Sequence, residues 1–192
     1  MRIDLGCGSM PRGDINITNG DSKKSLILDK YLKDYGFEYN PDAKIINSSI
    51  EDYLENNVIN KSDTVLMSHI IEHIYDLNSV MEKVINAEDV IIITPNSQFN
   101  NADWYDDTHI RSFTIPSLRN YLINWFNTLE IYPINYGIDI LAVGSYTNSI
   151  FHYSATFYYR HIEHSHNLIK LSKFYYRKFI MKKLDNKSGN LI

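Results

Sequence analysis

Residues 3–9 read Ile-Asp-Leu-Gly-Cys-Gly-Ser, a short apolar run that ends in two closely spaced glycines. The apolar part predicts a strand. Because Gly6 and Gly8 carry no Cβ, the backbone after this strand can approach a ligand closely. Only residues 9–14 separate this turn from the next predicted strand at 15–17, so no helix fits between them. The positive end of a helix, which often binds phosphate, is therefore not expected here.

Predicted strands and helices alternate along the first two-thirds of the chain. Apolar residues at helical spacing, followed by Gly36 where a C-terminal cap belongs, indicate a helix over 22–35. The unbroken β-branched run in 90–94 is typical of a strand covered on both faces. This α/β order predicts a parallel sheet with helices on both faces, whose ligands bind at the carboxyl ends of the strands. The other predicted elements are strands at 2–5, 15–17, 44–47, 63–68, 128–135 and 150–159, and helices at 50–56, 76–87, 116–126 and 167–184.

The segment Asp-Leu-Gly-Cys-Gly at a strand end resembles motif I of the class I S-adenosylmethionine (SAM)-dependent methyltransferases. The resemblance implies a Rossmann-like α/β fold with a mostly parallel seven-stranded sheet, helices on both faces and an antiparallel C-terminal strand. It also implies SAM as the cofactor, with Gly6, Cys7 and Gly8 under its methionine part and Asp4 holding its amino group. The longer run 6–17 is similar to a compact branch of this family that lacks the helix after the glycine turn.

Two positions depart from the family pattern. An acidic residue normally closes the second strand and binds the ribose hydroxyls of SAM, whereas this chain has Thr18 there, with Asp21 as an alternative group for the role. After the third strand, Ser49 takes the place of an acidic residue beside adenine, and Ile50 is expected to pack on the ring. A chain without these acids could also be a catalytically inactive binding module with the methyltransferase fold.

Residues 68–74 read Ser-His-Ile-Ile-Glu-His-Ile and follow the fourth predicted strand. They resemble the ubiquinone-biosynthesis O-methyltransferase-like group, or methyltransferase type 11, which carries Glu-His here close to SAM and the substrate. By this resemblance Ser68 and His69 contact the cofactor and His73 is catalytic. Some members bind a divalent cation, for which His69, Glu72 and His73 are the candidate ligands. A capping or supporting role for these side chains is the alternative.

The same letters, His-x-x-Glu-His at 69–73, also match the inverzincin zinc-protease motif, in which two histidines bind zinc and the glutamate polarises water. That chemistry needs a long helix around the motif. Here a strand is predicted to end directly before it, and Asp76 with Asn78 is predicted to begin a new helix directly after it. The protease interpretation is therefore disfavoured.

A long loop after the fifth predicted strand is the third candidate segment. Residues 103–114 contain the pattern His-x-Arg-x-Phe-Thr, which resembles the family's loop at this place. Trp104 and Tyr105 offer flat walls for a substrate, and Arg111 could hold an anionic substrate group or an internal carboxylate. The ordinary pKa of histidine suits proton transfer near neutrality, so we expect His109 to be catalytic, with a structural hydrogen bond as the alternative.

Composition limits the remaining possibilities. The chain has 192 residues and one cysteine, Cys7, which excludes an internal disulfide and zinc sites built on CxxC pairs. Cytosine-C5 methylation is excluded as well, because its nucleophilic cysteine would have to lie outside the glycine turn. No apolar run is long enough to span a membrane, and we expect a cytoplasmic protein.

The charge distribution suggests a main domain and an extension. We expect a SAM-binding methyltransferase domain over 1–160, without the usual N-terminal helical segment, and a basic, helical extension over 161–192. The extension is rich in lysine and arginine although the net charge of the chain is −4. The expected reaction is O-methylation of a small molecule or glycan. RNA methylation, with the extension on the phosphates, is an alternative, and a second copy of the chain could close the site in a homodimer.

Overall fold

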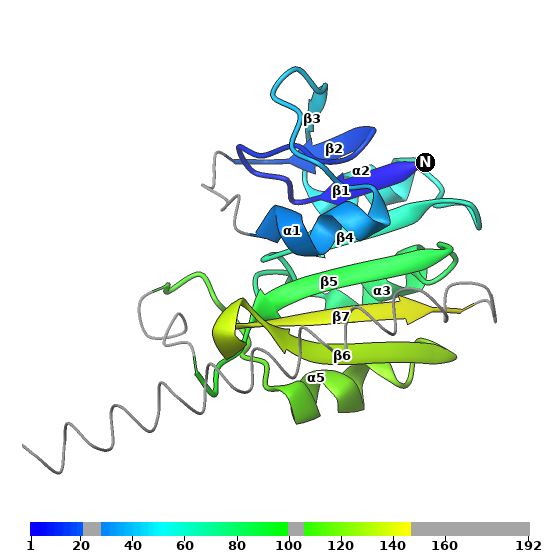
Figure 1. Cartoon of the computed structure of the whole chain (residues 1–192). Helices are drawn as coiled ribbons and strands as arrows, with labels where there is room; N and C mark the ends of the chain where they lie inside the picture. Colours follow the sequence, from blue (N-terminus) through cyan, green and yellow to red (C-terminus); the bar gives the residue numbers. More distant parts are fainter. Residues whose placement is uncertain (21–27, 100–105, 147–192) are drawn as a thin grey trace, which may run out of the picture. The chain divides into compact units, whose positions relative to one another are not determined.

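The computed structural model describes residues 1–20, 28–99 and 106–146. Within these residues, seven strands form one sheet in the order β3-β2-β1-β4-β5-β7-β6 (Figure 1). Every neighbouring pair is parallel except the two that β7 makes, with β5 and with β6. The predicted mostly parallel, seven-stranded sheet with an antiparallel C-terminal strand is therefore confirmed. The strands are β1 (Arg2–Leu5), β2 (Ile15–Thr18), β3 (Ile45–Asn47), β4 (Thr64–Ser68), β5 (Asp89–Pro95), β6 (Thr128–Ile134) and β7 (Asp139–Ser145).

Helices cover both faces of the sheet, as predicted. They are α1 (Asp29–Leu32) with the 3₁₀ turn η2 (Lys33–Tyr35), α2 (Ile50–Asn56), α3 (Leu77–Val84), α5 (Ile115–Leu122) and the 3₁₀ turn η3 (Asn135–Gly137). Side chains of β4 alternate between the faces: Val65 and Met67 pack in the core with α2, α3 and α5, while Leu66 packs in the core with α1. In Figure 1, α1 lies in front of the sheet and α3 behind it. No helix among the described residues has the length and apolar character needed to cross a lipid bilayer.

Local capping groups fix the ends of these helices. Thr114 accepts a hydrogen bond from the amide of Ser117, and the Ser117 hydroxyl bonds back to the Thr114 backbone, so the two form a capping box. Pro116 lies in the first turn of α5, where its missing amide hydrogen costs nothing. Gly36 ends η2 with a φ of 77°, in the left-handed region. The predicted C-terminal cap at Gly36 is confirmed.

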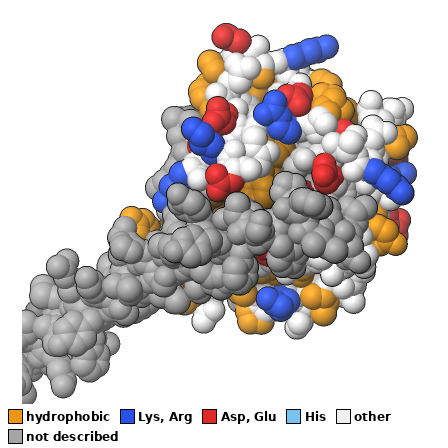
Figure 2. Space-filling model, turned by 45° about the vertical axis from the view of Figure 1, so that its right-hand side comes forward, with side chains coloured by type: hydrophobic (Ala, Val, Ile, Leu, Met, Phe, Trp, Pro, Cys, Tyr) orange, Lys and Arg blue, Asp and Glu red, His pale blue; other side chains and the backbone are white. Residues whose placement is uncertain are grey.

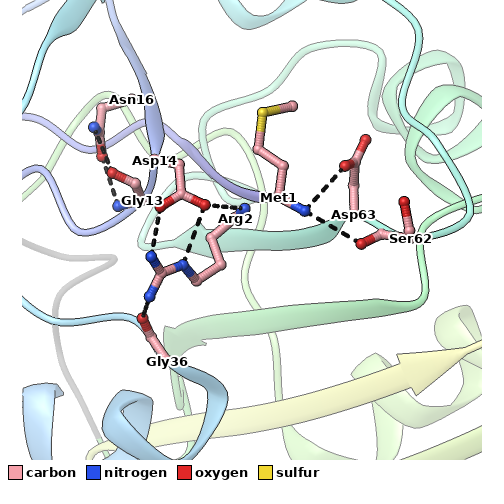
Figure 3. Close-up of polar contacts among 8 residues, drawn as sticks. All are labelled: Met1, Arg2, Gly13, Asp14, Asn16, Gly36, Ser62 and Asp63. Carbon is pink, nitrogen blue, oxygen red and sulfur yellow. Dashed lines mark hydrogen bonds and ion pairs between the residues drawn. The ribbon is translucent and has the colours of Figure 1, made fainter.

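The connection from β1 to β2 contains no helix, which confirms the prediction from its length. Residues 6–14 turn at the carboxyl end of β1 and return along its backbone to begin β2 in parallel. The amide of Asp14 donates to the carbonyl of Arg2 at 2.8 Å, and a Cβ on Gly13 would lie 2.8 Å from the same oxygen. The Asn16 side chain holds the amide and the carbonyl of Gly13 (Figure 3). Direct backbone contact therefore replaces a crossover helix here.

Charged groups fasten the amino end of β1 (Figure 3). The guanidinium of Arg2 donates to both carboxylate oxygens of Asp14 and to the carbonyl of Gly36. Hydrogen bonds from Arg2 hold the pKa of Asp14 below its usual range. The amino group of Met1 lies 3.3 Å from the buried carboxylate of Asp63. All of these contacts lie at the end of β1 opposite the glycine turn.

The structure corrects part of the sequence prediction. The resemblance predicted an antiparallel C-terminal strand, but its position at Asp139–Ser145 (β7) was not predicted, because the apolar run there contains Gly144, and a glycine weakens the strand signal. In the fold this glycine is required, since a Cβ there would collide with the ring of Phe126. Two predicted helices are shorter than expected, because α3 ends at Val84 and α5 at Leu122. The predicted strand at 150–159, the helix at 167–184 and the boundary after 160 lie outside the described residues.

Candidate functional site

The glycine turn lies at the tip of β1, on the carboxyl edge of the sheet, which is the left side in Figure 1. Gly6 and Gly8 have φ values of 83° and 56°, in the region that residues with a Cβ rarely adopt. The amides of Gly6 and Cys7 both donate to the carbonyl of Ile17, at 2.8 and 2.9 Å. A Cβ on Gly6 would lie 2.7 Å from Cγ1 of Ile70. Backbone conformation and close packing thus both require glycine at position 6.

Asp4 lies buried beneath this turn. Its Oδ2 accepts a hydrogen bond from the amide of Arg12 at 3.2 Å, so the returning connection orients the carboxylate. Arg12 is itself buried and forms an ion pair with Asp29 of α1, with Nε 2.8 Å from Oδ1. Asp4, which is predicted to hold the amino group of SAM, is therefore oriented by a backbone amide of the β1–β2 connection.

The carboxyl ends of β2 and β3 carry hydroxyl side chains that form hydrogen bonds with backbone groups two or three residues further along the chain. Thr18 Oγ1 donates to the carbonyl of Gly20 at 2.7 Å and accepts from its amide at 3.2 Å. Ser49 caps α2 by accepting the amide of Asp52 at 3.0 Å, and Ile50 beside it is buried. The proposed contacts of Thr18, Ser49 and Ile50 with ribose and adenine stay predictions, and Asp21 lies outside the described residues.

His69 follows β4 in a strained backbone conformation. Its φ of 50° lies in the left-handed region, and its amide donates to the carbonyl of Ile93 at 2.7 Å. Such a conformation costs on the order of 1 kcal/mol for a residue with a Cβ and persists where the surroundings impose it, often at functional sites. The next residue, Ile70, packs against Gly6. His69 is therefore adjacent in sequence to a residue that contacts the glycine turn.

Two buried carboxylates flank the imidazole of His69. Its Nδ1 lies 3.8 Å from Oε1 of Glu72, and its Nε2 lies 3.7 Å from Oδ1 of Asp139. Glu72 also accepts a hydrogen bond from the hydroxyl of Thr94 at 3.1 Å. Burial raises the pKa of Asp139, partly offset by a hydrogen bond from Asn135. Asp139 was missed at the sequence level because the position of β7, which begins with it, was not predicted.

Two further histidines, His73 and His109, lie close to Glu72. The rings of His73 and His109 meet edge to face, with centroids 4.6 Å apart. Nδ1 of His73 lies 3.0 Å from the hydroxyl of Thr108, and Nε2 of His109 lies 3.5 Å from Oδ2 of Asp106. Hydrogen bonds from the hydroxyl and amide of Thr108 lower the pKa of Asp106. The structure thus brings the two predicted catalytic histidines together, with 6% of the His109 side chain exposed.

The metal-ligand geometry differs from the predicted one. Glu72, His73 and His109 each offer a ligand atom, and these atoms lie within 4.8 Å of one another, whereas His69 is not part of this group. Other protein groups already contact each of the three side chains: Thr94 donates to Glu72, Thr108 lies against His73, and Asp106 lies 3.5 Å from His109. Residues 71–73 form a turn and not a helix, so the zinc-protease interpretation lacks the element it requires.

Arg111 connects the loop before α5 to the turn that carries Glu72 and His73. Its guanidinium donates to the carbonyls of Ile71 at 3.1 Å and Tyr75 at 2.9 Å, and also to that of Ile74. These bonds hold the turn in place. The predicted substrate role of Arg111 stays a prediction, and Trp104 and Tyr105 lie outside the described residues.

On the part of the described surface that is visible in Figure 2, acidic and basic side chains lie interspersed. The lysine- and arginine-rich stretch on which the RNA alternative depends lies outside the described residues. That alternative therefore stays a prediction from sequence.

Known proteins with similar structures are methyltransferases, although no family model and no curated protein matches the sequence. One is a SAM-dependent methyltransferase from Archaeoglobus fulgidus, with a TM-score of 0.47, 15% identity, and 74% of this chain and 84% of that one covered. Another is the plantazolicin methyltransferase BpumL in complex with a desmethylPZN analog and SAH, with a TM-score of 0.45, 12% identity and 74% of each chain covered. A third is DhpI in complex with SAH, with a TM-score of 0.44, 9% identity and 74% of each chain covered. Because these scores lie below 0.5, the fold assignment depends on the strand order itself.

Proposed function

We propose that this chain is a SAM-dependent methyltransferase that transfers the methyl group to an oxygen of a small molecule or glycan. The observation that carries the proposal is the position of the glycine turn. Strand order reverses between β1 and β4, because the chain leaves β1 toward β2 and β3 and returns to β4 on its other side. Ligands of open α/β sheets bind at such a switch point, outside the carboxyl ends of the strands. Gly6, and Ile70 in contact with it, lie there.

The missing helix after β1 supports this choice of ligand. Dinucleotide sites place a helix amino terminus against the phosphates, and here residues 6–14 return to β2 without one. SAM has no phosphate group and needs no such helix. The glycine turn and the buried carboxylate of Asp4 would hold its methionine part, and the ends of β2 and β3 would hold its ribose and adenine.

When bound, SAM supplies a methyl group on a positively charged sulfur, which makes that methyl electrophilic. The protein then has to align an acceptor oxygen with the methyl group and take the hydroxyl proton. The buried carboxylates Glu72 and Asp139 and the histidines around them lie beside the switch point, on the side of β5 and β7. This arrangement suits deprotonation of a neutral hydroxyl acceptor.

Calorimetric titration of the full chain with SAM and with its demethylated product SAH tests the cofactor. We expect both to bind, with Kd values within the roughly 1 μM to 1 mM range typical of enzyme substrates. The absence of binding by either compound would contradict the proposal and would favour an inactive module with this fold.

Transfer of tritiated methyl groups from SAM into fractionated cell extract tests the acceptor. We expect label in the small-molecule or sugar fractions, in a product that resists nuclease. Label confined to RNA, together with binding that falls steeply as salt is added, would overturn the acceptor class while leaving the methyltransferase assignment in place.

A further inference from the structure

Three side chains beside the switch point have the donor atoms of a transition-metal site. Glu72 and His73 lie on the turn after β4, His109 comes from the loop before α5, and one ligand atom of each lies within 4.8 Å of the others. The ligand atoms of a four-coordinate zinc ion lie roughly 3–4 Å apart, so small side-chain rotations would close this group on an ion. Zinc takes two imidazoles with one carboxylate as ligands, whereas magnesium and calcium prefer oxygen ligands.

Backbone contacts hold the two segments in this arrangement. The amide of Ile110 donates to the carbonyl of Glu72 at 3.0 Å. The guanidinium of Arg111 donates to the carbonyls of Ile71 and Tyr75. The residues next to the candidate ligands therefore place the two segments against each other, and a site preorganised in this way loses little conformational entropy when it binds an ion.

The hydrogen bonds of Thr108 fix which nitrogen of His73 carries the hydrogen. The Thr108 hydroxyl donates its hydrogen to Oδ1 of Asp106, so its oxygen, 3.0 Å from Nδ1 of His73, acts there as an acceptor. The carbonyl of Thr108, 3.3 Å from the same nitrogen, can only accept. Nδ1 is therefore the protonated nitrogen of the neutral ring, and Nε2 carries the lone pair that a metal ligand needs.

Polar groups also orient the other two side chains. Oδ2 of Asp106 lies 3.5 Å from Nε2 of His109, and the hydroxyl of Thr94 donates to Oε2 of Glu72 at 3.1 Å. Metal-bound histidines usually donate their other N–H to a carboxylate or a carbonyl, and metal-bound carboxylates are hydrogen-bonded in turn. Glu72 is also buried, and a dication beside it would offset the cost of keeping its charge away from water.

We propose that Glu72, His73 and His109 bind one divalent transition-metal ion of the zinc type. His69 is not a ligand, because its two ring nitrogens face Glu72 and Asp139 and it lies outside the group. The ligand set thus takes His109 from the loop in place of the His69 expected from the sequence. Three protein ligands leave one position of a four-coordinate ion to water or to an acceptor oxygen.

Calorimetric titration of the metal-free full chain with zinc chloride, without SAM, tests the proposal. We expect a site with a Kd on the order of 1 μM or tighter, and no comparable binding of magnesium chloride. Cobalt(II) should bind at the same site and give the visible absorption of a four-coordinate ion. Absence of zinc binding, or a preference for magnesium, would overturn the inference.

Matched histidine variants locate the ion. His73→Asn and His109→Asn should each lower the zinc affinity by more than about 100-fold, whereas His69→Asn should change it by less than about threefold. Asparagine tolerates the left-handed backbone of position 69. If zinc binds equally well after His109→Asn, the ion is held elsewhere, for example by the histidines within 152–166, and the inference is wrong. An equal loss in His69→Asn and His109→Asn would also overturn it.

Asp106→Asn supplies a variant that does not put the fold at risk, because 46% of the Asp106 side chain is exposed. Its carboxylate orients His109 directly and His73 through Thr108, so we expect the zinc affinity to fall by about 10- to 100-fold. Urea unfolding without metal checks that each variant is folded. Unchanged zinc affinity in Asp106→Asn would mean that these histidines do not hold the ion. Zinc binding and SAH binding are measured separately, so the metal site and the proposed function can fail independently.

Discussion

At the ends of β1, β2 and β3 the chain presents backbone, short hydroxyl side chains and one buried carboxylate, that of Asp4. Around the ends of β4 and β5 and the start of β7 it presents two buried carboxylates together with imidazoles. The first region, which we call the cofactor half because the proposed function puts SAM there, has the hydroxyls of Thr18 and Ser49 bonded to their own turns. The second, which we call the acceptor half for the proposed acceptor, has Glu72 and Asp139 facing His69 from both sides. The two halves meet where Ile70 packs on Gly6.

Under the proposed function, this difference divides recognition between the two halves. A cofactor held mainly by backbone shape needs fewer acidic side chains, because the turn itself defines the site. An acceptor that must lose a proton needs charged groups kept away from water, where their interactions are stronger. Changes in the cofactor half should therefore act through sterics, and changes in the acceptor half through hydrogen bonds and charge.

The largest expected effect is that of Gly6→Ala on SAM binding. The added Cβ would meet Ile70 at 2.7 Å on a backbone with a φ of 83°, so the turn has to move. We expect a loss of affinity on the order of 100-fold, about 3 kcal/mol, measured by calorimetric titration. Gly20→Ala is the matched control, because its Cβ would meet nothing within 4 Å. Equal affinities of the two variants would mean that backbone shape does not define the cofactor half.

Thr94→Val should have an intermediate effect and act on stability alone. Valine has the shape of threonine but cannot donate to Oε2 of Glu72, which leaves a buried carboxylate with one donor fewer. We expect the free energy of unfolding in urea to fall by about 1–3 kcal/mol, with SAM affinity unchanged. Thr128→Val, which removes only a 3.3 Å bond to a carbonyl, should cost less. A loss of SAM affinity in Thr94→Val would show that the halves are coupled.

The smallest expected effect is a pH dependence carried by Asp139. Burial raises its pKa in the folded chain, so its contribution to stability is complete below about pH 4 and is lost as pH rises through the folded pKa. In Asp139→Asn this loss is absent. As the pH rises from about 4 toward neutrality, we expect the unsubstituted chain to lose stability relative to the variant, measured by urea unfolding. Parallel stability curves for the two proteins would contradict this.

Local sequence signals predicted most of the sheet. The bounds of β1 and α2 match the predicted ranges, because an apolar run before glycines and helical spacing are both short-range patterns. The strand β7 depends instead on non-local packing. Its Gly144 makes room for Phe126, and its neighbours β5 and β6 cover it on both edges. No local sequence pattern near residue 144 indicates that β5 and β6 pair with this segment.

The candidate site, like the sheet, was predictable where local sequence patterns define it. The two glycines at positions 6 and 8 predict an unusual backbone conformation, because glycine readily adopts a positive φ. The pattern His-x-Arg-x-Phe-Thr also pointed to His109 as a residue of the candidate site. The pairing of His69 with Asp139 was not predictable, because it depends on the antiparallel register that sets Asp139 opposite Pro95. Sequence patterns placed His69 and His73 directly after a strand and His109 in a long loop, but only the fold shows which carboxylates lie beside them.

The short return from β1 to β2 also has a consequence for how the chain folds. Residue 3 pairs with residue 15 in this parallel ladder, whereas residue 2 pairs with residue 64 across the β1–β4 ladder. Two neighbouring parallel strands are usually joined by a crossover helix, in a unit of some 30 residues. The conformational entropy lost when such a connection closes grows with its length. The pairing of β1 with β2 can therefore form early, as a nucleus onto which the more distant strands assemble.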